Sequence, residues 1–176
     1  MRIIRNRHFR CIGIISISLL LGCWFTPQPE SADNDSEPAE LLQSGVYGIS
    51  TLQEPSATWI TDHVDLLELY KNLNKRHSGD DGNPPEMNFN IYGVLFLEMG
   101  QKTTGGYAFS FNPSHSRAVD SQTVIQVGWN VPPEGAIVTQ VLTSPYILLK
   151  VKKTEINTIL VLDQNGRSLF EIPIKL

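Results

Sequence analysis

The sequence has few of the groups on which common catalytic and metal sites depend. It contains two cysteines and four histidines in 176 residues. Both cysteines lie within the first 23 residues, so the rest of the chain must fold without a disulfide. No apolar run reaches the ~20 residues of a membrane-spanning helix. This absence excludes a multi-span transporter or channel.

The N-terminus carries an export signal. Four arginines precede an apolar run, Ile12–Leu21, which is followed by Gly22 and Cys23. A basic start, a short apolar run and a small residue are typical of a secretory signal. The ending Leu20-Leu21-Gly22-Cys23 resembles the lipobox of bacterial lipoproteins. This resemblance implies that residues 1–22 are a signal peptide and that Cys23 is the lipid attachment site; an uncleaved signal anchor is the alternative.

The lipobox resemblance also implies a location. Two or three acyl chains, at about 0.8 kcal/mol per buried CH₂, would hold the protein stably on a membrane. Trp24 stands where an inner-membrane retention signal would have Asp, so we expect the periplasmic face of the outer membrane of a Gram-negative bacterium. Removal of residues 1–22 leaves 10 Lys and Arg against 18 Asp and Glu, a net charge of −8. This charge disfavours nucleic acid as a partner.

The remainder divides into a tether and one domain. Residues 23–43 begin with the lipidated cysteine and continue as an acidic stretch rich in Pro and Ser, which cannot bury enough apolar surface to offset its ordering entropy. We therefore expect a solvated tether over residues 23–43. Residues 44–176 have the size of a single domain with its own core.

The pattern of the domain predicts one helix among short strands. Asp62 is a suitable N-cap for an amphipathic helix over about 63–75, whose apolar face would comprise Val64, Leu66, Leu67, Tyr70 and Leu73. The residues after 85 favour strands, with 90–99 central, a further strand over 137–142, and a type I′ hairpin at Asn165-Gly166. Pro173 suits an edge strand. The predicted fold is mainly β (α+β), an antiparallel β-sheet or sandwich of seven to nine short strands with one packed amphipathic helix.

The candidate chemical groups do not form a recognisable catalytic motif. His63, His77 and His115 have no nucleophile motif around them. His77, Asp80 and Asp81 lack the spacing of zinc or calcium ligands. The glycine-rich stretch 100–106 lacks the order of a phosphate-binding loop, and a strand rather than a helix follows it. We therefore expect no enzyme activity, no cofactor and no metal.

Several segments together resemble a known family. They are Phe89 before an apolar strand, the stretch Gly100-Gln-Lys-Thr-Thr-Gly-Gly-Tyr107, the loop Pro132-Pro133-Glu134-Gly135, and Thr143-Ser144-Pro145-Tyr146. This series is similar to the C-terminal domain of the PrcB family of protease-complex subunits. The resemblance implies a non-catalytic lipoprotein that binds and stabilises a partner protein such as a surface protease. The residues predicted to contact the partner are Thr104, Gly105, Gly106, Tyr107, Ser144, Pro145 and Tyr146.

Two alternatives remain open for these residues. The stretch Thr103–Tyr107 is also similar to the Thr-Thr-Gly-aromatic loop of chagasin-type inhibitors, which implies inhibition of cysteine proteases. The other alternative is structural, since Gly105 and Gly106 could serve turn geometry while Tyr107 and Tyr146 fill the core.

Overall fold

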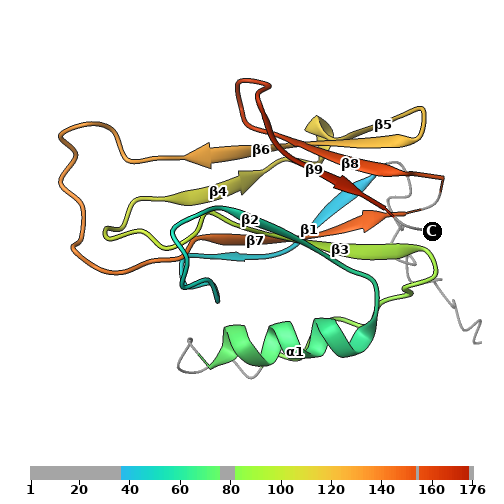
Figure 1. The fold of residues 1–176 in the computed structure, drawn as a ribbon, viewed down its shortest axis with the longest axis horizontal. Coiled ribbons are helices and arrows are strands. Elements are labelled where there is room, and N and C mark those ends of the chain that lie inside the picture. The colour runs from blue at the N-terminus through green and yellow to red at the C-terminus, as the bar shows by residue number, and fades with distance from the viewer. Residues whose placement is uncertain (1–36, 76–81, 154, 175–176) are drawn as a thin grey trace, which may run out of the picture. The chain divides into compact units, whose positions relative to one another are not determined.

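The computed structural model describes residues 37–75, 82–153 and 155–174, and these belong to one compact unit, residues 34–176. In the described ranges the chain forms nine β-strands, one α-helix and a short 3₁₀ helix, Pro113–His115. Figure 1 shows the helix on one side of a sheet and a second sheet on the other side. The predicted signal peptide and most of the predicted tether lie outside the described residues.

Four antiparallel strands form the first sheet, in the order β1-β7-β3-β2. They are β1 (Ala39–Gly45), β2 (Ser56–Ile60), β3 (Tyr92–Glu98) and β7 (Tyr146–Lys152). The prediction that the segment 90–99 is central is confirmed, because β3 lies between β7 and β2.

The second sheet has the order β4-β6-β8-β9, and β5 also pairs with β6. Its strands are β4 (Ala108–Phe111), β5 (Arg117–Val119), β6 (Gln122–Asn130), β8 (Thr158–Leu162) and β9 (Ser168–Pro173). The mainly β fold with one packed helix is confirmed, and Pro173 does lie in an edge strand.

One feature of the second sheet differs from the prediction of an antiparallel arrangement. Strands β6 and β8 pair in parallel, with Thr123 opposite Ile159 and Ile125 opposite Val161. In the sequence, β7 lies between β6 and β8, and it belongs to the other sheet. The chain reverses direction once between β6 and β7 and again between β7 and β8, so β8 runs parallel to β6. A period-two pattern cannot reveal this, since it is the same in both pairings.

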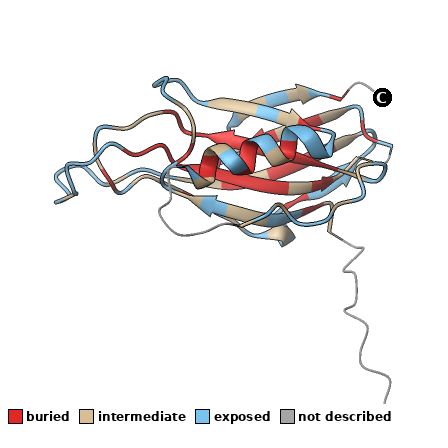
Figure 2. Ribbon diagram, turned by 90° about the horizontal axis from the view of Figure 1, so that it is seen from below, coloured by how far each residue is buried: buried red, intermediate tan, exposed pale blue. Residues whose placement is uncertain are grey.

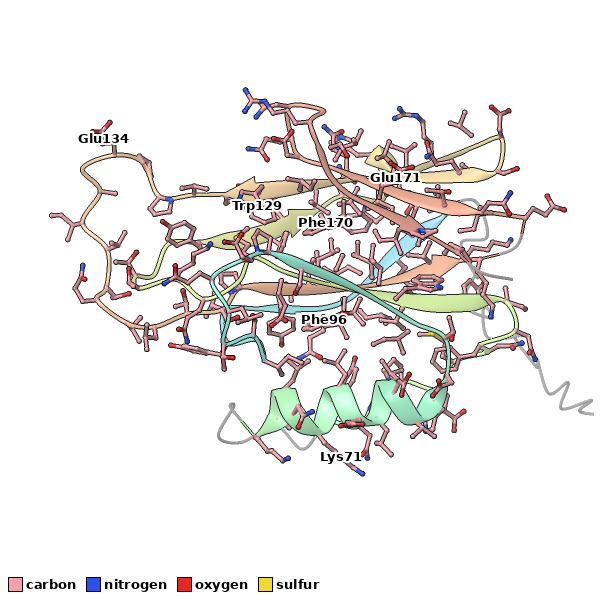
Figure 3. The ribbon with its side chains drawn as sticks, in the orientation of Figure 1. Lys71, Phe96, Trp129, Glu134, Phe170 and Glu171 are labelled. Carbon is pink, nitrogen blue, oxygen red and sulfur yellow. The ribbon has the colours of Figure 1, made fainter. Side chains whose placement is uncertain are left out.

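Strands β3 and β7 are buried on both faces. Leu95 and Leu149 point into the core between the two sheets, whereas Phe96 and Leu148 point toward the helix. Figure 2 shows the two strands as largely buried segments beneath the helix, and Figure 3 places Phe96 between the sheet and α1. Burial on both faces explains why this part of the sequence is a continuous apolar run rather than an alternating one.

The helix α1 (His63–Asn74) begins where the sequence predicts. The Asp62 carboxylate caps it by accepting the backbone N–H groups of Val64 and Asp65, each at 2.9 Å. Its buried face consists of Leu66, Leu69, Tyr70 and Leu73. The assignment of Val64 to this face is wrong, because Val64 is 73% exposed. It lies two residues before Leu66, which places the two side chains on opposite sides of a helix.

The folded part begins earlier than the predicted boundary at residue 44. Strand β1 starts at Ala39, whose side chain is buried in the core between the sheets. The Lys152 backbone N–H also donates to the Pro38 carbonyl at 3.0 Å. The polar residues before residue 44 are typical of a tether. An edge strand, however, is held mainly through its backbone and needs few apolar side chains.

The turn between β8 and β9 is a hairpin, as predicted, but not of type I′. Gly166 has φ +78 whereas Asn165 has a negative φ, so only one of the two residues is left-handed. The Asp163 carboxylate accepts the backbone N–H groups of Asn165 at 2.8 Å and Arg167 at 2.9 Å. This bonding favours a wider turn with a bulge between Val161 and Leu162.

These hydrogen bonds predict a pH-dependent contribution to stability. The Arg167 backbone N–H holds the pKa of Asp163 below its usual 3.8, with the Asn165 N–H adding to it against a smaller opposing effect of burial. Because the folded-state pKa is depressed, this stabilisation is present above the unfolded pKa and is lost as pH falls through the folded pKa. We expect the urea midpoint of the wild type to fall more steeply than that of Asp163→Asn between about pH 4 and about pH 2. Equal slopes would contradict the assignment.

The doubly buried strands predict where truncation costs most. Leu149→Ala removes a fully buried side chain of β7 and should lower the free energy of unfolding by about 2–5 kcal/mol. The matched control Val64→Ala removes an exposed side chain and should change it by less than about 0.5 kcal/mol. Urea unfolding followed by tryptophan fluorescence measures both. Similar costs for the two variants would show that β7 is not central.

Candidate functional site

Three loops meet at one end of the sandwich, and we call them together the loop end: residues 46–55, 99–107 and 131–145. The first connects β1 to β2, the second β3 to β4, and the third β6 to β7. In Figure 1 the second and third loops extend beyond the ends of β4 and β6, and Figure 3 places Glu134 at the outer end of the third.

Backbone hydrogen bonds join the loops to one another. The Gln101 N–H donates to the Leu52 carbonyl at 2.7 Å. Lys102 and Thr143 each donate a backbone N–H to the other's carbonyl, at 2.8 and 2.9 Å. The Gly105 N–H donates to the Thr139 carbonyl at 2.9 Å. The loop end is therefore a connected structure rather than three independent loops.

A buried carboxylate ties the first loop to the central sheet. Glu98, at the end of β3, is only 4% exposed. Its Oε1 accepts the backbone N–H groups of Ile49 and Ser50, each at 2.8 Å. A backbone N–H group that is away from water and has no acceptor costs about 1–3 kcal/mol. Glu98 therefore holds the loop 46–55 against the strand from which the second loop departs.

The second predicted contact segment lies inside the protein. Ser144, Pro145 and Tyr146 are all buried, with Tyr146 1% exposed. The Tyr146 ring packs against Phe96 with centroids 6.0 Å apart, and its hydroxyl accepts a hydrogen bond from Gln43 Nε2 at 2.8 Å. The prediction that these three residues present contact points to a partner is wrong.

The burial of Tyr146 has a physical cause and an electrostatic effect. The residue begins β7, whose helix-facing side continues with Leu148 into the core beneath α1. Burial raises the pKa of the Tyr146 hydroxyl, against a smaller lowering by the Gln43 hydrogen bond. The pKa of Tyr70 is raised by the same cause and by the neighbouring Tyr146. Both phenol side chains are therefore part of the hydrophobic cluster beneath α1.

The first predicted contact segment is divided between core and surface. Gly105 is buried, and a Cβ there would meet the Thr139 hydroxyl, so any larger residue would force the Thr139 side chain to move. Gly105 is therefore not the predicted surface contact residue but a buried position where two loops approach each other closely. Thr104 and Tyr107 are half-buried, and Gly106 is exposed. Partner contact by these three residues stays a prediction.

The surface of the loop end is made by residues that the sequence did not single out. Seven of the eleven exposed large hydrophobic side chains of the described residues lie here: Val46, Tyr47, Leu52, Val131, Ile137, Val141 and Leu142. The prediction of a strand over 137–142 is wrong, because this stretch is an irregular loop. Apolar residues after Pro132-Pro133 were the available signal, but the same pattern is typical of a buried strand.

The described residues do not gather a metal site. Nowhere in the described ranges do three His, Cys, Asp or Glu side chains come together. His63 and His115 are both exposed, at the start of α1 and in the 3₁₀ helix respectively. His77, Asp80 and Asp81 lie outside the described residues.

The fold defines the class of the protein: a β-sandwich domain with a helix packed on one outer sheet face and a long, internally bonded loop end. Residues 94–152 match the family model described as PrcB C-terminal. The match runs from β3 to β7 and includes the second and third loops. No curated protein and no solved structure gives a significant match to the chain.

The role of Glu98 gives a testable prediction. Glu98→Ala would leave two backbone N–H groups without their acceptor, at about 1–3 kcal/mol each. Glu98→Gln keeps an acceptor oxygen and should cost less. Hydrogen exchange should become faster at Ile49 and Ser50 in the alanine variant, while the exposed Glu54→Ala serves as the matched control. Unchanged exchange at both amides would show that Glu98 does not hold the loop.

Proposed function

We propose that this protein is a non-catalytic, lipid-anchored accessory protein of the cell envelope. Its β-sandwich domain binds a partner protein, a component of an envelope protease complex, and stabilises it. The anchor is Cys23, and the location is the periplasmic face of the outer membrane.

The observation that carries this proposal is the family match. The PrcB C-terminal family suggests association with a protease complex. The matched residues 94–152 contain the two central strands β3 and β7 and two of the three loops of the loop end. The part of the chain that matches the family model is thus also the part that builds the most exposed loops.

Two further observations support a binding role. The exposed apolar side chains of the described residues concentrate at the loop end, and an apolar patch on a protein surface is typical of an interaction site. The hydrogen bonds between the loops fix their conformation before any partner arrives. A preorganised surface loses less entropy on binding than free loops would.

The proposed anchor rests on the sequence around Cys23. No helix of the described part of the chain is long and apolar enough to cross a membrane. The run Ile12–Leu21 before Gly22-Cys23 has the order of a lipoprotein signal.

The anchor can be tested by substitution of the cysteine. Cys23→Ser should abolish labelling of the full-length protein by radioactive palmitate in cells, because a hydroxyl does not replace the thiol that is acylated. It should also leave the unprocessed chain with its signal. The matched control Cys11→Ser lies within the signal and should retain labelling. Labelling of the Cys23→Ser protein would refute the assignment.

The binding role can be tested in cells that make the full-length protein with a C-terminal affinity tag. We expect one envelope protease to co-purify with the tagged protein from detergent-solubilised membranes. We also expect the half-life of that protease to fall at least several-fold when the lipoprotein is deleted and to recover on complementation. Repeated purification without a protease would contradict binding. An unchanged half-life of the protease after deletion of the lipoprotein would contradict stabilisation.

A further inference from the structure

We infer that the loop end is the docking surface and that it binds an apolar, weakly charged hollow on a partner protein. This inference rests on the proposed function and names the surface through which that function works.

The apolar character of the loop end is concentrated at its most exposed positions. Ile137 is 104% exposed, Leu52 70% and Leu142 59%. Burial of such side chains against a partner would be favourable by about 25 cal/mol per Å² of apolar surface removed from water. A single exposed apolar residue is ordinary, but these three come from the first and third loops, which hydrogen bonds to the second loop join.

The charges of the loop end identify the chemistry of the partner. Its three loops contain only Glu54, Lys102 and Glu134 as charged residues. The Lys102 ammonium lies 5.8 Å from the centre of the Tyr107 ring and thus makes a cation–π contact within the loop end. A surface with so few charges is matched by an apolar partner surface, because a highly charged one would lose its hydration without gaining ion pairs.

Strand β1 runs toward the loop end from the opposite end of the sheet. The strand starts with Ala39 opposite Val151 and ends with Gly45 opposite Tyr146, beside the third loop. Its length of 7 residues corresponds to about 23 Å at ~3.3 Å per residue. Strand β1 therefore begins at the end of the sheet opposite the loop end, as Figure 1 shows.

The charge of this part of the molecule favours a protein over the membrane as the occupant. Glu134 at the outer end of the third loop and the net charge of −8 after processing both oppose contact with anionic lipid. The convex loops around Ile137 instead fit a hollow on another protein.

Photocrosslinking in living cells tests the surface directly. A photoreactive amino acid would replace Ile137 or Leu52 in the full-length lipoprotein. The controls would carry it at Ile91 or Val119, which are also exposed but lie at the opposite end of the sheets. We expect a crosslink to the co-purifying protease from the first two positions, at least tenfold stronger than from the controls.

Charge substitution gives an independent readout. The double variant Ile137→Glu, Leu142→Glu changes two exposed side chains and should reduce recovery of the protease at least tenfold. Val119→Glu, an exposed side chain in β5, should leave recovery unchanged. Circular dichroism and palmitate labelling would show that both variants are folded and anchored.

The outcomes separate this inference from the proposed function. If the wild type recovers the protease and the double variant recovers it equally well, the docking surface is wrong while the binding function stands. If the wild type recovers no protease, the proposed function is overturned. A crosslink from position 137 to lipid, or to a second copy of this chain, would overturn the inference by identifying the membrane or self-association as the occupant.

Discussion

The pairing of β3 with β7 is the constraint on which the rest of the structure depends. Both strands bury side chains on both of their faces, toward the second sheet and toward α1. Neither layer could form alone, because each covers apolar residues that would otherwise face water. The same two strands also fix where the second loop begins and where the third loop ends, so the core determines where the loop end lies.

The loop end combines a rigid base with an apolar surface. Its base consists of groups that are themselves buried, notably Glu98 with its two backbone hydrogen bonds and Tyr146 against Phe96. Cross-loop hydrogen bonds such as that from Gly105 to Thr139 extend this order outward. Buried residues thus form the base, and the exposed side chains around Ile137 lie on top of it.

Some features of this protein follow from local physics and were therefore predictable. The helix cap at Asp62, the central position of β3 and the edge position of Pro173 each depend on neighbouring residues or on a short apolar pattern. The start of β1 was not predictable in this way, because an edge strand is held by backbone bonds to β7. The parallel pairing of β6 with β8 depends on the passage through the other sheet, which no local pattern records.

The sequence by itself determined the class of fold, the family resemblance and the expectation of an anchor at Cys23. Only the tertiary structure decided which candidate contact residues reach the surface. Tyr107 and Tyr146 were both candidate contact residues, yet Tyr146 is buried and Tyr107 only half-buried. Ile137 looked like a core strand residue and is fully exposed. The reason is that exposure depends on what packs above a side chain, and segments distant in the sequence supply those neighbours.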